Sequence, residues 1–289
     1  MDDAARGIDA LASRLNALAD AQPFATSWYV RNLVTGEAAD RRGSDPVPSA
    51  STRKTSILMA ALKAVHEGRL SLDEPITVEA AYQAGVTSGV FQHMTPGYVI
   101  PFRDALVQMI ITSDNVCTHH VVDRIDLDEL NQYCRAIGLT GTVHRFKVPP
   151  PDLKADHKLD AVTTTTPTDQ GVLLEMILAG TTDAAAAKKL GSTPKLCQWA
   201  IEVLTWQVHR NMIPALLPFG TVVANKTGRG PRGRMDAGLV FRAGKPLYVL
   251  TAFTDGVPEE MPDGLPGFAA AFATIARMAR TCWDSIGRK

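Results

Sequence analysis

The chain has 289 residues, of which 45% are apolar and 21% charged, a composition that permits a large hydrophobic core and excludes disordered and collagen-like proteins. Its 30 basic side chains balance 30 acidic ones, so the formal net charge is +0 and no summed positive field favours a nucleic-acid backbone or an anionic membrane surface. We therefore predict a small-molecule partner, with neither nucleic acid nor membrane as a partner.

The two ends of the chain carry the strand patterns. Residues 4–19 place apolar side chains at helical spacing and predict an opening helix. Residues 27–34 are rich in aromatic and β-branched residues before the turn signal Thr35-Gly36, which predicts a strand. Near the other end, strands are predicted over 221–224, 237–241 and 247–253, followed by a closing helix over 267–286.

The middle of the chain, from residue 52 to residue 215, has mainly helical periodicity. Its clearest helical segments are 57–65, 103–111, 116–125, 127–137, 170–179 and 196–208. Because strands from both chain ends can form one antiparallel sheet only by meeting in space, we predict an α/β (α+β) fold. Residues 1–51 and 216–289 would form the sheet lobe with its flanking terminal helices, residues 52–215 would form an inserted all-helical lobe, and a cleft would lie between the lobes.

Neither a targeting segment nor a cysteine framework is apparent. The N-terminus has no basic flank and no apolar run of 7–15 residues, so we expect a cytoplasmic protein, with a trimmed exported protein as the alternative. The four cysteines form no C-x-x-C pair and are expected to be free buried thiols. No Cys or His spacing resembles a zinc site, and neither a metal nor a cofactor is expected.

Ser51 and Lys54 form the pattern S-x-x-K at the start of an apolar helical run. Because residues three apart share a helix face, the amine can reach the hydroxyl, and a lysine of lowered pKa can activate a serine as a nucleophile. The first turn of a helix also offers backbone N–H groups to a developing oxyanion. The alternative is a capping serine beside a solvated lysine, since the pattern occurs about once by chance in such a chain. Ser192 and Lys195 form a second match.

Ser113-Asp114-Asn115 lies between two predicted helices. One interpretation is an interhelical turn, because these residue types satisfy free N–H groups at helix starts. The other is functional: Ser113 could relay a proton between Lys54 and a leaving group, and the Asn115 amide could hold a substrate carbonyl and contact a lysine.

Lys226-Thr227-Gly228 follows the predicted strand 221–224. At a strand edge beside a nucleophile, backbone N–H groups can supply a second oxyanion donor, and the glycine lets a substrate approach closely. The Lys226 charge could bind a substrate carboxylate and lower the pKa of Lys54. The alternative is an ordinary lysine and turn glycine at a strand end. All three patterns occurring in this order by chance has a probability on the order of one in a thousand, so together they predict one site in the cleft.

With these three motifs, the sequence resembles the class A β-lactamases within the penicillin-recognising superfamily. Gly138–Thr142, the Thr-Thr-Pro ending at Pro167 and the segment 213–218 are also similar to that group. The resemblance covers most of the chain and implies one β-lactamase-like unit. It implies acylation of Ser51, with Lys54 as proton acceptor and the N–H groups of Ser51 and Arg229 as the oxyanion hole. The residues that it implies for substrate binding are Asn115, Lys226, Thr227, Gly228, Arg229 and Arg234.

One departure from the resemblance concerns deacylation. The family has a glutamate on the loop before Thr-Thr-Pro that positions the hydrolytic water, whereas residues 144–167 contain no glutamate and the matching position falls in Pro149-Pro150-Pro151. The remaining acids or bases of that loop after His144 are Asp152, Asp156, His157 and Asp160. Alternatively, Lys54 could serve both half-reactions.

The sequence therefore predicts a serine hydrolase that hydrolyses a β-lactam or a related amide bond through an acyl-enzyme at Ser51. The first alternative is an intracellular amidase, peptidase or esterase of the same fold. The second is a penicillin-binding type of protein that is acylated without turnover. The substrate is a small-molecule amide, lactam or ester in the first two cases, and the sequence does not define the oligomeric state.

Overall fold

A five-stranded antiparallel sheet forms the centre of the protein, in a computed structural model that describes residues 7–286. The strand order is β2-β1-β9-β8-β7, so the strands from both chain ends pair in the middle, where Trp28 lies opposite Ala252. This arrangement confirms the predicted sheet. The strands are β1 (Ala25–Asn32), β2 (Ala38–Arg41), β7 (Val223–Arg229), β8 (Arg234–Arg242) and β9 (Lys245–Asp255).

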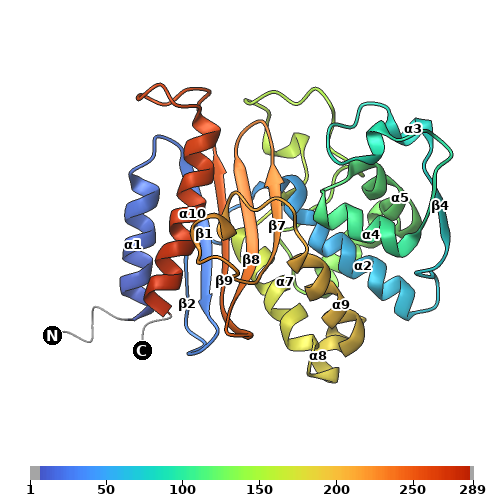
Figure 1. Ribbon diagram of the computed structural model, residues 1–289, viewed down its shortest axis with the longest axis horizontal. Coiled ribbons are helices and arrows are strands. Elements are labelled where there is room, and N and C mark those ends of the chain that lie inside the picture. The colour runs from blue at the N-terminus through green and yellow to red at the C-terminus, as the bar shows by residue number, and fades with distance from the viewer. Residues whose placement is uncertain (1–6, 287–289) are drawn as a thin grey trace.

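The two terminal helices cover one face of this sheet, as predicted. Figure 1 shows α1 (Ile8–Asp20) and α10 (Gly267–Ile286) side by side on that face. Apolar side chains of both helices pack with the buried Trp28 and Tyr248 of the sheet, and the Tyr248 hydroxyl donates a hydrogen bond to the Ala279 carbonyl at 2.7 Å. Burial of these faces holds the helices on the sheet. Residues 4–6 of the predicted opening helix lie outside the described residues.

The helical middle of the chain covers the other face of the sheet (Figure 1). At its centre is α2 (Lys54–His66), with ten of its 13 residues buried, as expected for a helix that is apolar on all sides. The other helices are α3 (Ala80–Gln83), α4 (Phe102–Ile111), α5 (Asn115–Ile125), α6 (Leu127–Ala136), α7 (Pro167–Gly180), α8 (Ala184–Lys189) and α9 (Pro194–Thr205).

Short elements connect these layers. Two small ladders pair β3 (Val47–Pro48) with β6 (Thr164–Thr165) and β4 (Pro75–Thr77) with β5 (Val99–Pro101). The 3₁₀ turns are η2 (Ala50–Arg53), η3 (Phe91–His93), η4 (Leu159–Ala161) and η5 (Ile213–Leu216). The prediction that residues 52–215 are all-helical was wrong, because β4, β5 and β6 lie within them. The division into lobes at residues 51/52 and 215/216 stays a prediction.

Two boundary predictions near the motifs were wrong. The strand expected over 221–224 runs from Val223 to Arg229, because pairing with β8 continues through Lys226-Thr227-Gly228. Tertiary pairing thus outweighs the low strand preference of lysine and glycine. Ser51 lies in the 3₁₀ turn η2, and α2 begins only at Lys54. The run Ala184–Lys189, for which no helix was predicted, forms α8.

The structure also describes the four cysteines and shows whether a helix could span a membrane. All four cysteines are free and buried, which confirms the expected thiols. Among the helices in residues 7–286, none combines the length and the apolar character that a membrane span needs.

Candidate active site

The three sequence motifs meet at one cavity of about 450 Å³. Its lining includes Ser51, Ser113, Asn115, Thr227 and Arg229. They come from η2, the turn before α5, α5 and the strand β7, which brings together residues from distant parts of the sequence. A concave site with converging polar groups is the usual form of a small-molecule site.

Two residues of the cavity wall have a backbone conformation that non-glycine residues rarely adopt. Ala50, which precedes Ser51, has φ +40°, and Ser113 has φ +60°. Each such residue costs on the order of 1–3 kcal/mol, and residues of this kind concentrate at active sites. Ser51 is half-buried at the cavity wall. The backbone strain therefore falls on both sides of the site, at the nucleophile turn and at the turn before α5.

The Lys54 amine lies in the interior, with its residue only 1% exposed. Its Nζ donates to the Ser113 carbonyl at 2.7 Å and to Asn115 Oδ1 at 2.7 Å, and it lies 3.2 Å from Ser113 Oγ. Burial first, and then the charges of Lys226 and Arg53, hold the pKa of Lys54 well below its usual 10.5. Such an amine is deprotonated at a lower pH than an ordinary lysine, as a general base must be.

The spacing of Ser51 and Lys54 led us to expect a hydrogen bond between the amine and the hydroxyl, and the structure has other partners for the amine. In residues 7–286, the Lys54 amine makes its hydrogen bonds to Ser113 and Asn115, and none joins it to the Ser51 hydroxyl. The start of α5 places the Ser113 carbonyl and Asn115 Oδ1 each 2.7 Å from the amine, and these oxygens accept its hydrogen bonds. The expected contact of Asn115 with a lysine is present.

The Ser113-Asp114-Asn115 segment is the helix start that one interpretation predicted, while the proton relay and the substrate contact of the other stay predictions. Asp114 caps α5, because its Oδ1 accepts from the Cys117 N–H at 2.9 Å, while its Oδ2 accepts from the Phe91 N–H at 2.8 Å. The Ser88 hydroxyl donates to the Ser113 carbonyl at 2.9 Å. The turn is thus a helix start that also fixes the groups around the Lys54 amine.

Lys226 is fully buried behind Thr227, and its Nζ donates to the Thr227 carbonyl at 2.9 Å. Burial lowers the pKa of Lys226 to about 7; Asp236 opposes this shift and Arg229 adds to it. Gly228 has no room for a side chain, because a Cβ there would lie 2.6 Å from Met235 Cγ and 3.1 Å from the Ala50 Cβ. A glycine is therefore needed where β7 passes the nucleophile turn.

The sequence analysis missed the buried pair beneath Lys226. Asn225 Nδ2 donates to both carboxylate oxygens of Asp236, at 3.0 and 3.1 Å, and the Ile213 N–H donates to Oδ2 at 3.0 Å. Burial raises the pKa of Asp236 to about 6. The available signal was an acidic residue inside the otherwise apolar strand β8.

Arg229 and Arg234 take different positions. Arg229 lines the cavity with an exposed side chain. Arg234 is absent from the lining: its Nη1 donates to the carbonyls of Gly230 and Gly233 at 2.7 and 2.9 Å, and its guanidinium carbon lies 3.3 Å from the Phe268 ring centroid. A role of Arg234 in carboxylate binding stays a prediction.

The loop before α7 presents prolines to the cavity. Pro149, Pro150, Pro151 and Leu153 line it, and no Asp or Glu stands among the lining residues that the structure describes. The loop residues considered as possible bases lie outside that lining, with Asp152, Asp156 and Asp160 exposed and His157 half-buried.

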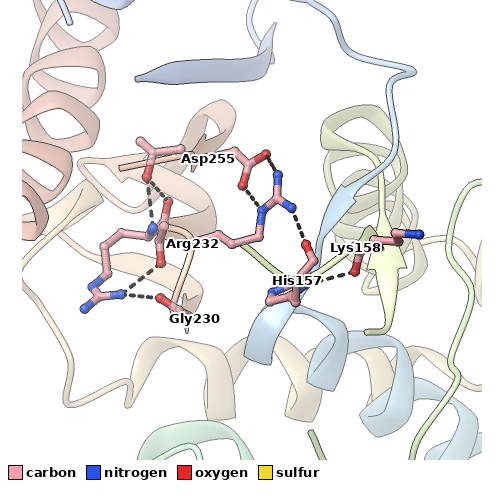
Figure 2. A network of polar contacts seen from close by, with 8 residues as sticks. His157, Lys158, Gly230, Arg232 and Asp255 are labelled. Carbon is pink, nitrogen blue, oxygen red and sulfur yellow. Dashed lines mark hydrogen bonds and ion pairs between the residues drawn. The ribbon is translucent and has the colours of Figure 1, made fainter. Parts of the chain in front are cut away.

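Arg232 fastens the middle of this loop to the sheet. Figure 2 shows it between Asp255 and the His157 carbonyl, with which it makes hydrogen bonds of 2.6 and 2.5 Å.

His209 also lines the cavity and was missed in the sequence analysis. Burial lowers its pKa, and Arg229, Lys226 and Lys54 lower it further, so that the neutral imidazole is favoured. It follows α9 in an irregular segment, which gave no periodic signal. The cavity lining thus includes an imidazole whose neutral form is favoured, and Lys54 and Lys226 lie behind that lining.

Comparisons with known proteins find similar sequences. Residues 10–286 match the sequence model described as the β-lactamase enzyme family. The curated β-lactamase AER-1 of Aeromonas hydrophila is 30% identical over 200 residues, which are 69% of this chain and 62% of that protein, so the alignment spans less than two thirds of the relative.

Solved structures agree over nearly the whole chain. A structure of PBP-A has a TM-score of 0.81 at 26% identity, covering 97% of both chains. A β-lactamase from Sphaerobacter thermophilus DSM 20745 has a TM-score of 0.82 at 22% identity, covering 97% of this chain and 98% of that one. A PBP-A variant solved as an acyl-enzyme complex with penicillin G has a TM-score of 0.81 at 26% identity over 97% of both chains.

Proposed function

The chain belongs to the β-lactamase enzyme family, and from this premise we propose that it hydrolyses a β-lactam or a related amide through an acyl-enzyme at Ser51. The observation that carries the proposal is the buried Lys54 amine of lowered pKa, fixed by Ser113 and Asn115 beside the cavity that Ser51 lines. A buried lysine of lowered pKa can act as the general base for a serine nucleophile.

In the acylation step, Ser51 Oγ attacks the substrate carbonyl carbon while its proton passes to Lys54 Nζ. The carbonyl oxygen becomes an oxyanion, which the backbone N–H groups of Ser51 and Arg229 stabilise. Collapse of this intermediate breaks the C–N bond, and the proton passes from Lys54 through the Ser113 hydroxyl, 3.2 Å away, to the leaving nitrogen.

Substrate binding uses the strand β7 and the start of α5. The Asn115 amide would hold a substrate carbonyl, and Lys226 and Thr227 would bind a substrate carboxylate, with Arg229 and Arg234 adding positive charge near it. Gly228 would let the substrate lie against the strand. Because Lys226 is buried and its pKa is about 7, a bound carboxylate would stabilise its charged form.

Deacylation would use Lys54 again. Water attacks the acyl carbon, Lys54 takes its proton, and the ester bond to Ser51 breaks as the proton returns to Ser51 Oγ. The proline wall of the cavity, formed by Pro149–Pro151, supports this assignment, because the cavity lining that the structure describes contains no carboxylate base. The same observation favours the two alternatives: an amidase, peptidase or esterase of this fold, and a protein that stays acylated.

Steady-state hydrolysis of nitrocefin and of p-nitrophenyl esters separates a β-lactam hydrolase from an esterase or amidase of this fold. We expect wild-type nitrocefin turnover, abolished in Ser51→Ala and retained in Ser192→Ala, the serine of the second S-x-x-K match. Ester cleavage with negligible nitrocefin turnover would favour the esterase or amidase. Activity of Ser51→Ala equal to wild type would contradict a serine mechanism at this site.

A further inference from the structure

Arg53 lies between Ser51 and Lys54 in the sequence, and its side chain is unusually placed for an arginine. The residue is 1% exposed and is one of the largest fully buried side chains. Its Nη1 donates to the Phe146 carbonyl at 2.7 Å and its Nη2 to the Lys147 carbonyl at 2.5 Å. Within residues 7–286 no carboxylate pairs with it. Burying a cation that has only neutral partners costs free energy of folding, and a functional role would explain why this arginine is present.

His144 fixes the position of this guanidinium. Arg53 Nη1 lies 3.4 Å from His144 Nδ1, which must accept, so the imidazole proton is on Nε2, 3.1 Å from Ser56 Oγ. The Ser56 hydroxyl in turn donates to the Arg53 carbonyl at 2.7 Å. Asn131 of α6 holds the backbone N–H and carbonyl of His144, both at 2.8 Å. His144, which contacts the guanidinium, is therefore held by Ser56 of α2 and by Asn131 of α6.

The two carbonyls that Arg53 binds lie directly before the proline run. Phe146 and Lys147 lead into Pro149–Pro151, which line the active cavity. Arg53 and Pro149 also line a neighbouring cavity of about 70 Å³. Two other arginines fasten the same loop: Arg145 donates to the Val162 carbonyl at 2.9 Å, and Arg232 binds the His157 carbonyl (Figure 2). Of the three, Arg53 alone belongs to the turn that carries Ser51.

We propose that Arg53 is a positioning residue for acylation, which fastens the proline wall of the cavity to the turn that carries the nucleophile. The inference rests on the proposed function, because acylation of Ser51 is the step that it serves. Two carbonyls in fixed positions suit the two-pronged guanidinium, whereas a single lysine amine has no matching fork.

The charge of Arg53 has a second effect, on Lys54. The groups that act on the Lys54 amine, besides burial, are Lys226 and Arg53, which lower its pKa, and Asp114 and Cys117, which raise it. Ser113 and Asn115 contact it as neutral groups. Removing the Arg53 charge would therefore raise the pKa of Lys54, and the acylation rate would reach its half-maximum at a higher pH.

Three variants separate the hydrogen bonds of Arg53 from its charge. Arg53→Lys keeps the charge and loses the fork, and Arg53→Met loses both. Arg145→Met removes the hydrogen bonds that join the two stems of the same loop. Acylation of Ser51 by benzylpenicillin is followed by intact-protein mass spectrometry between pH 5 and 10. We expect about a 10-fold slower rate with an unchanged pH midpoint in Arg53→Lys, and about 100-fold with a midpoint about one unit higher in Arg53→Met.

Amide hydrogen exchange of residues 146–153 tests the fastening without activity. We expect faster exchange there in both Arg53 variants, and Arg145→Met should leave the pH midpoint unchanged. Wild-type exchange and wild-type acylation in Arg53→Lys would overturn the inference, and so would a midpoint shift in Arg145→Met equal to that in Arg53→Met. If the wild type is not acylated, the proposed function fails, whereas the exchange result still decides whether Arg53 holds the loop.

Discussion

Lys54→Met is expected to slow acylation of Ser51 by about three orders of magnitude, the effect expected for removing the base that activates a serine nucleophile. Methionine keeps the length and apolar stem of the side chain and removes the amine that joins Ser113 to Asn115. The loss should therefore appear in the acylation rate while the fold, checked by circular dichroism, is retained. Single-turnover mass spectrometry with benzylpenicillin measures it.

The second S-x-x-K match provides the control for this prediction, and the lowered pKa of Lys54 determines its pH dependence. Lys195 occupies the same pattern but is exposed, so Lys195→Met should acylate at the wild-type rate. In the wild type, the rate should rise with pH as Lys54 loses its proton, with a midpoint well below 10.5 because the pKa is lowered. Wild-type acylation in Lys54→Met would remove Lys54 from the mechanism.

Lys226→Met is expected to lower kcat/KM for a carboxylate-bearing β-lactam by about 100-fold, and for a neutral p-nitrophenyl ester by less than 10-fold. The difference arises because an ion-paired hydrogen bond in a buried site contributes about 1.5–3 kcal/mol, and only the carboxylate substrate makes it. Both rates are compared on the high-rate plateau of each pH profile, since removing Lys226 also raises the pKa of Lys54.

The pH dependence of substrate binding provides an independent check on Lys226. Its protonated form binds the carboxylate and its pKa in the free protein is about 7, so KM for the carboxylate substrate should rise as the pH increases through that value and above it. The ester should show no such rise. Equal losses for both substrates in Lys226→Met would show that the residue supports the structure and does not bind the carboxylate.

Local patterns in the sequence predict much of this protein. The helical spacing at both ends and the strands near Ser27 and Leu247 predict a single sheet formed by the two chain ends, which β1 and β9 confirm. The three motifs predict one cavity, because their order and placement exceed chance, and Ser51, Ser113 and Thr227 line it together. These features depend on periodicity and on short motifs, which a sequence shows directly.

Features that depend on tertiary contacts could not be predicted. The amine of Lys54 turns to Ser113 and Asn115 because α5 begins beside it. Arg234 lies over Phe268 of α10, a residue 34 positions away in the chain. Arg53 and Asp236 are buried by elements that no local pattern connects to them. For Asp236 the available signal was a carboxylate inside a mostly apolar strand, and that signal does not identify the contacting residues.

Intact-protein mass spectrometry of the wild type and Ser51→Ala, followed over time after mixing with benzylpenicillin, tests most directly whether this cavity forms an acyl-enzyme. We predict that the wild type gains the mass of one acyl group and then returns to its original mass, while Ser51→Ala never gains it. A wild type that shows no adduct with benzylpenicillin, nitrocefin or an activated ester, or a Ser51→Ala variant that gains the same mass at the same rate, would contradict the account.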